Sequence, residues 1–226
     1  MVTGTRLSGI GGLLVFVGAV AFVLHVVLRS VLTAGVDPAV PAQAGLWVPV
    51  NALGALGAAL VLVGLPAVYA RMAPQGGLPG LVGFALIGVS WMFFGLFLSL
   101  YGALVQPWLA DQAPRLVAAD APAPEGVVVA FAVGLLAWLL GAVLLAVPFV
   151  RGRVRPRWVG YLLPASALWV LMGNFVIAPG GPASNLTVNL VSNLGPMLLL
   201  IGLVYLGFRA WAERAPAKHV GQGADV

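Results

Sequence analysis

A small set of polar side chains lies within or beside long apolar runs of this sequence, where polar groups are rare and mark contacts between helices or binding sites. His25 and Arg29 are four residues apart, which places them on one face of a helix. Asn185, Asn189 and Asn193 repeat that spacing and form an asparagine ladder. The candidate ligand-binding residues are His25, Arg29, Asn51, Tyr101, Gln106, Asn174, Asn189 and Asn193.

These residue types favour binding of a polar or anionic group. The planar guanidinium of Arg29 matches the geometry of phosphate and carboxylate groups. His25 is a side chain that suits a general base. A simpler interpretation is that the asparagines and serines hydrogen-bond to neighbouring helices, at about 0.6–2 kcal/mol each. The sequence leaves both interpretations open.

Six long apolar runs would position these side chains, and they predict an all-α polytopic membrane bundle of six transmembrane helices. The predicted spans are 7–28, 46–70, 78–105, 126–150, 158–177 and 186–208. Hydrophobic residues make up 62% of the 226 residues and charged residues 8%, against about 25% charged residues in a soluble domain. We therefore expect a single transmembrane domain over 1–215 and a disordered cytoplasmic tail over 216–226.

Basic residues gather on one side of the predicted bundle, at Arg6, Arg71, Arg151, Arg153, Arg155, Arg157, Arg209, Arg214 and Lys218. The opposite side has Arg29 and Arg115, with acids at Asp37, Asp111, Asp120 and Glu125. The positive-inside rule then puts both termini in the cytoplasm. Arginine outnumbers lysine ten to one, and Ala, Gly and Val dominate, which is typical of a high-GC bacterial genome, so we expect a bacterial inner membrane. In that orientation the candidate residues lie in the outer half of the bundle, and the inner half is almost purely apolar.

Small residues recur on single faces of the predicted helices. Gly11, Gly18 and His25 follow one another in seven-residue steps, and 46–70 carries Gly54, Gly57 and Gly64. Helices associate within lipid by close packing, so small residues mark contact faces. We expect these glycines to form seams between helices.

Several kinds of site are disfavoured. No Asp, Glu or Lys lies in a predicted span, which argues against carboxylate-based proton coupling. A lone intramembrane histidine makes a poor metal site, and cysteine is absent. The net charge of +5 comes without a basic patch interleaved with aromatic residues, so we expect no nucleic-acid partner. We also expect no metal and no cofactor.

Two stretches carry short motifs. The opening segment RLSGIGGLLVFVGAV begins with Arg-x-x-Gly, and LLAVPFVRGRVRPRWVGYLL contains Pro156, Arg157 and Trp158 between two apolar runs. Both stretches resemble a bacterial family of six-helix integral membrane proteins of unknown function, in the start of its first helix and in the link between its fourth and fifth helices. The resemblance implies a fold and a topology, and it implies no activity.

Three functions remain open at this point. The first is a carrier or sensor that binds a small or lipid-like ligand from the outer side. The second is a structural or accessory subunit whose glycine- and asparagine-rich faces pack against a protein partner in the membrane. The third is a membrane-embedded enzyme that acts on a lipid, with His25 as its base. Membrane lipids are the partners common to all three.

Overall fold

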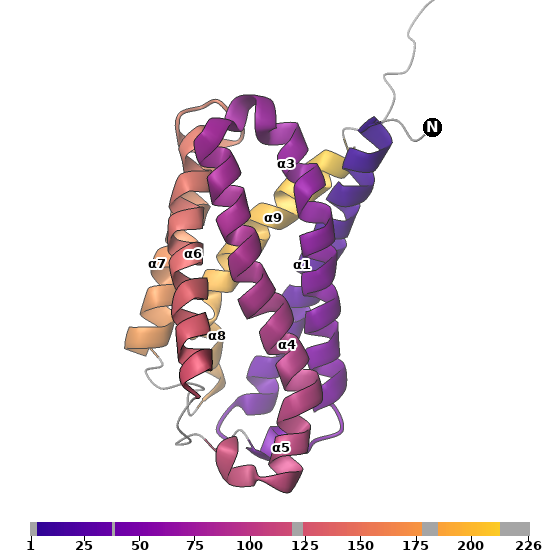
Figure 1. The fold of residues 1–226 in the computed structure, drawn as a ribbon, viewed down its shortest axis with the longest axis vertical. Coiled ribbons are helices and arrows are strands. Elements are labelled where there is room, and N and C mark those ends of the chain that lie inside the picture. Colours follow the sequence, from indigo (N-terminus) through magenta and orange to yellow (C-terminus); the bar gives the residue numbers. More distant parts are fainter. Residues whose placement is uncertain (1–3, 38, 119–123, 178–184, 213–226) are drawn as a thin grey trace, which may run out of the picture.

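The computed structural model describes residues 4–37, 39–118, 124–177 and 185–212, and over these ranges the chain is helical and has no strand (Figure 1). The predicted tail over 216–226 lies outside the described residues, as does Asp120. The elements in chain order are α1 (Gly4–Thr33), α2 (Ala39–Ala42), α3 (Trp47–Trp91), η1 (Met92–Phe97), α4 (Leu98–Leu100), η2 (Tyr101–Val105), α5 (Gln106–Gln112), η3 (Pro114–Leu116), α6 (Glu125–Val150), α7 (Arg157–Met172), η4 (Gly173–Ile177), α8 (Leu186–Ser192) and α9 (Leu194–Ala212).

Five segments of the described chain are long and apolar enough to cross a membrane, namely Gly9–Thr33, Trp47–Gln112, Glu125–Val150, Arg157–Ile177 and Leu194–Ala212. Their outward faces carry large apolar side chains, such as Leu56, Val63 and Leu104, that are more than half exposed. Apolar surface of this kind is stable against lipid chains and costly in water. The several long apolar helices are therefore those of a membrane-embedded protein.

The longest of these segments, Trp47–Gln112, folds back on itself at Gly77 (Figure 1). A straight helix of 66 residues would be about 100 Å long, which is about three times the hydrocarbon thickness of a bilayer. Gly77 adopts φ 59°, a left-handed value that favours glycine, and the chain reverses there. The Tyr69 and Phe84 rings meet near the turn with centroids 5.1 Å apart. At the far end the Trp47 indole Nε1 donates to the Gly102 carbonyl at 2.9 Å. The segment is thus a hairpin of two antiparallel arms.

The glycine seams predicted from the sequence are confirmed between α1 and α3. A Cβ added at Gly18 would stand 2.6 Å from the Gly57 carbonyl oxygen, and one added at Gly57 would stand 2.8 Å from the Gly18 carbonyl oxygen. Gly11 and Gly64 face one another in the same way one step along the seam. The two backbones approach so closely that only glycine fits. Gly12 and Gly207 form a second such contact between α1 and α9.

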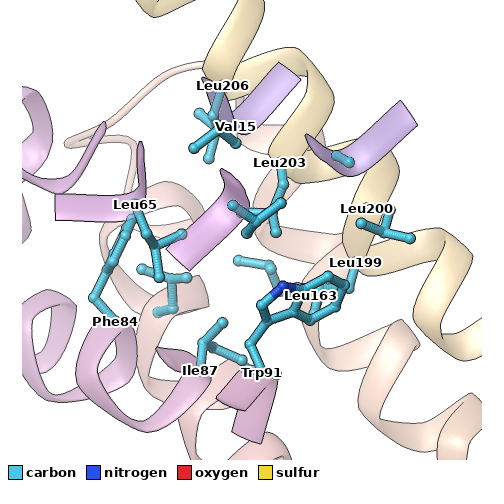
Figure 2. Close-up of a cluster of buried hydrophobic side chains, with 14 of the residues drawn as sticks. Val15, Leu65, Phe84, Ile87, Trp91, Leu163, Leu199, Leu200, Leu203 and Leu206 are labelled. Carbon is cyan, nitrogen blue, oxygen red and sulfur yellow. The ribbon is translucent and has the colours of Figure 1, made fainter. Parts of the chain in front are cut away.

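The apolar core lies among these helices. Figure 2 shows side chains from several helices that point toward one another, including Val15, Leu65, Phe84, Trp91 and Leu203. Val15 and Leu200 are fully buried, and Leu163, Leu199 and Leu203 are nearly so. Large side chains therefore fill the space beside the seams where glycine brings the backbones together.

The bundle has two chemically different ends. The arginine-rich end carries Arg71, Arg151, Arg153, Arg155, Arg157 and Arg209. The Gly77 turn, the beginning of α1 and the end of α9 also lie there, because Arg71 bonds to the Ala210 carbonyl and Gly12 packs on Gly207. The opposite end, here called the α5 end, is closed by a small cluster that includes Ala42, Trp47, Ala110 and Val117.

The predicted helix over 186–208 is wrong as a single element. The structure has α8 and α9 instead, separated at Asn193. Pro196 has no backbone N–H and its ring clashes with the carbonyl four residues earlier, that of Ser192. The helical hydrogen-bond pattern is therefore interrupted at this point, and the Asn193 side chain satisfies the end of α8 by donating to the Asn189 carbonyl at 2.8 Å.

Candidate functional site

A cavity of about 300 Å³ lies inside the bundle, toward the α5 end. Helices α1, α3, α6, α7, α8 and α9 and the short segments η1, α4 and η4 all contribute to its wall. The polar residues that line it are His25, Arg29, Ser30, Thr33, Asn174, Asn189, Ser192 and Asn193. The apolar lining includes Phe22, Trp91, Phe94, Leu98, Phe131, Trp138 and Pro196. The cavity is therefore amphipathic.

His25 occupies a space that the glycine seam leaves open. A Cβ added at Gly54 would stand 2.6 Å from Cγ of the imidazole, so the ring fills the position of the missing side chain. Nδ1 lies 2.8 Å from the Val50 carbonyl oxygen, and because a carbonyl only accepts, Nδ1 is the donor. This bond ties α1 to α3 and fixes the ring. Within the described ranges, this is the hydrogen bond of the ring, and Nε2 makes none.

Arg29 lies one helical turn after His25 on the same face of α1. Its guanidinium lies over the Trp47 ring, 5.7 Å from the centroid, which is within the range of a cation–π contact. No Asp or Glu of the described segments is within ion-pair distance of this guanidinium, and none lines the cavity. Among the described residues, the guanidinium of Arg29 thus contacts an aromatic face and no carboxylate.

The asparagines play different roles around the cavity. Asn189 is buried and joins α8 to α1, since Nδ2 donates to the Thr33 hydroxyl at 3.3 Å and to the Ser30 carbonyl at 3.4 Å. Thr33 in turn donates to the Arg29 carbonyl at 2.9 Å. Asn174 donates to Val170 within its own helical segment, and Asn193 caps α8. Among the described residues, Asn189 is the member of the ladder whose side chain links two helices.

Aromatic rings form a large part of the cavity lining. Phe22 contacts the His25 ring at 5.2 Å and the Trp91 ring at 4.8 Å between centroids. Phe94 meets Phe131 and Trp138 at 5.2 and 5.8 Å. Edge and tilted contacts of this kind hold rings in fixed orientations. The rings give the cavity a rigid apolar wall.

Two wall segments are π-helical. Phe94 belongs to η1, and Gly173 with Asn174 belongs to η4. A π-helical turn contains an extra residue, which shifts the side chains of the next turn around the helix, and such turns are frequent at functional sites. Gly173 is needed there because a Cβ would collide with the Ser192 carbonyl.

Three of the candidate residues do not line the cavity. Asn51 is fully buried inside the hairpin of Trp47–Gln112, where Nδ2 donates to the Trp47 carbonyl at 2.9 Å and Oδ1 lies against Gly102. Oδ1 has no hydrogen-bond partner in the described part of the chain. Tyr101 begins η2 and stacks on Phe97 at 6.5 Å, and Gln106 begins α5. These three residues lie in the Trp47–Gln112 segment and outside the cavity lining.

The sequence interpretation missed Ser30, Thr33 and Ser192, and it missed the aromatic residues of the lining. Thr33 continues the four-residue spacing of His25 and Arg29, so a signal for it was present. The rings carry no such signal, because an aromatic residue in an apolar run is equally compatible with lipid, core or cavity. Over the ranges that the structure describes, no three His, Cys, Asp or Glu side chains gather into a metal site.

No protein-family model matches this chain, and no curated protein or solved structure matches it. The resemblance to a bacterial six-helix family therefore stays a prediction.

Proposed function

We propose that this membrane protein binds a small amphipathic ligand with an anionic head group in the cavity, and that it acts as a carrier or sensor for that ligand. The observation that carries the proposal is the composition of the lining, which combines Arg29 and polar side chains of α1, η4 and α8 with aromatic rings of α1, α3, η1 and α6. An anionic head would lie against Arg29 and the asparagine amides. An apolar chain would lie against the rings.

The charge of Arg29 supports an anionic head. A cation within an apolar helical bundle is costly unless an opposite charge compensates it. The Trp47 ring offers only part of that compensation, since a cation–π contact contributes about 0.5–2 kcal/mol. A phosphate or carboxylate would accept hydrogen bonds from the guanidinium in a bidentate geometry.

The volume supports a small ligand or the first part of a lipid chain. Ligand pockets are usually about 300–1,000 Å³, and this cavity, at about 300 Å³, lies at the lower limit. Binding is also favoured over catalysis, because no carboxylate of the described segments lines the cavity to orient His25 as a base. The enzyme and the accessory subunit remain predictions with less support.

The proposal includes six spans and both termini in the cytoplasm of a bacterial inner membrane. The reversal at Gly77 supports six spans, because each arm of Trp47–Gln112 exceeds the roughly 20 residues that cross a bilayer. The arginine-rich end supports a cytoplasmic assignment by the positive-inside rule. The cavity would then lie in the outer half of the membrane.

Ligand retention measured by native mass spectrometry tests the proposal. Purified protein would be released from micelles after incubation with octyl phosphate, or with octylamine, which has the same chain and the opposite charge. We expect octyl phosphate to be retained and octylamine not. Arg29→Gln should weaken retention by about tenfold, which corresponds to about 1.4 kcal/mol.

Arg115→Gln is the matched control, because Arg115 is exposed at the same end of the bundle and does not line the cavity. It should leave retention unchanged. Equal retention of octyl phosphate and octylamine, or equal losses in Arg29→Gln and Arg115→Gln, would show that the amphiphile binds to the surface of the protein and not in the cavity.

A further inference from the structure

A second cavity, of about 400 Å³, lies at the arginine-rich end of the bundle. Its lining comes from α3, from the loop between α6 and α7, and from α9. The lining residues are Val68, Arg71, Met72, Gln75, Gly152, Arg153, Val154, Arg155, Leu206, Arg209 and Ala210. Four arginines therefore surround one space.

The loop that supplies two of these arginines is held in a fixed shape. The N–H groups of Arg153 and Val154 both donate to the Pro148 carbonyl, at 3.0 and 3.1 Å, and Gly152 donates to Phe149 at 2.9 Å. Gly152 has φ 72°, the left-handed value that ends a helix in this way. Val154 is buried in the apolar core. Arg153 and Arg155 thus flank Val154 in a turn whose backbone is held in place.

The other two arginines are fixed by bonds between elements. Arg71 of α3 donates through Nη1 to the Ala210 carbonyl in the last turn of α9, at 2.8 Å. Arg209 of α9 donates through Nη1 to the Arg155 carbonyl in the loop, also at 2.8 Å. These bonds hold both guanidinium groups at the rim of the cavity. They also link the three elements that form it.

The floor of the cavity is apolar. Val68, Met72, Leu206 and Ala210 are buried beneath the arginines. Nearby, the Trp158 and Tyr205 rings meet at 5.0 Å between centroids. Trp and Tyr concentrate at the level of lipid head groups in membrane proteins. The cavity therefore combines a basic rim with an apolar floor near the depth at which phosphate groups of lipids lie.

We propose that this cavity is a binding site for a phosphate group, held by Arg71, Arg153, Arg155 and Arg209. Several like charges around one space raise the local potential and attract anions. A guanidinium group forms two parallel hydrogen bonds to two oxygens of a phosphate. Basic pockets at the ends of membrane helices are typical sites for anionic lipid head groups. The phosphate comes either from an anionic phospholipid or from solution. The proposal does not depend on the ligand in the first cavity.

The test compares two double variants of the full chain that remove equal charge from the segment of residues 151–157. Arg153→Gln with Arg155→Gln removes cavity residues, and Arg151→Gln with Arg157→Gln removes residues that do not line it. Native mass spectrometry would measure retention of phosphatidylglycerol and of phosphatidylcholine. We expect the first pair to weaken phosphatidylglycerol retention by about tenfold and the second pair to have little effect.

Inorganic phosphate distinguishes the two sources. If it displaces phosphatidylglycerol and raises the melting temperature of the protein, the site accepts free phosphate. If it does neither while lipid retention still depends on Arg153 and Arg155, the site is selective for a lipid head group. Equal losses in both double variants would overturn the proposal, because they would indicate general attraction to basic charge. Equal retention of phosphatidylcholine and phosphatidylglycerol in all variants would also overturn it.

Discussion

The imidazole of His25 on α1 lies where the side chain of residue 54 on α3 would stand, so Gly54 determines the position of His25. A Cβ added at Gly54 would stand only 2.6 Å from Cγ of the ring. Nδ1 of the ring donates to the carbonyl of Val50, which lies one turn before Gly54 on α3. His25 thus continues the seam of Gly11 and Gly18. His25 therefore both packs against Gly54 in the contact between α1 and α3 and lines the cavity.

Gly54→Ala should displace His25 and destabilise the protein. The added methyl group meets Cγ, Cδ2 and Nδ1 of the ring, and such overpacking costs about 1–3 kcal/mol. Thermal unfolding in detergent should show a lower melting temperature. Gly126→Ala is the control, because a Cβ at Gly126 meets nothing within 4 Å. Equal melting temperatures for the two variants would contradict the close packing of His25 on α3.

Asn189→Leu should lower stability more than Asn174→Leu. Asn189 bonds across to Ser30 and Thr33 on α1, whereas Asn174, over the described part of the chain, bonds to Val170 in its own helical segment. Hydrogen bonds between membrane helices contribute about 0.6–2 kcal/mol, so the difference in unfolding free energy should be of that size. The measurement is unfolding of each variant in the same micelles. A larger loss for Asn174→Leu would be inconsistent with the bonds at Asn189.

Accessibility of single cysteines tests the hairpin and the orientation together. The chain has no cysteine, so Gln75→Cys and Gln112→Cys each introduce one thiol. Both glutamines are exposed, one beside the Gly77 turn and one at the end of α5. In intact bacterial cells, a thiol reagent that does not cross membranes should label only Gln112→Cys. Labelling of Gln75→Cys alone would reverse the orientation, and labelling of both would contradict the crossing between them.

Sequence patterns predicted the features that depend on helix faces. Seven-residue steps of glycine indicated the seam between α1 and α3, because that spacing brings side chains to one face. The four-residue step from His25 to Arg29 indicated two residues of the cavity wall for the same reason. Apolar length predicted where helices run, and it predicted 126–150 to within one residue of α6.

Features that depend on how helices face one another were not predictable in this way. Asn51 has a depth similar to that of the cavity residues, but it faces Gly102 inside the hairpin of Trp47–Gln112. Pro196 is a sequence signal for the break at Asn193. The continuous apolar run over 186–208 favoured a single helix instead. The rings of Phe94, Phe131 and Trp138 become a cavity wall only when η1 and α6 pack together. Tertiary packing, and not the spacing of residues in the sequence, determines which side chains of different helices face one another.

The attachment site of a photoreactive amphiphile tests ligand binding in the cavity most directly. An alkyl phosphate with a diazirine at the end of its chain would be added to the purified protein, and the mixture would be irradiated. Peptide mass spectrometry would then locate the adducts. We expect adducts on Phe94, Phe131 or Trp138, with fewer in Arg29→Gln and no change in Arg115→Gln. Adducts confined to outward-facing residues such as Val63 and Leu104, with no effect of Arg29→Gln, would contradict a ligand site inside the bundle.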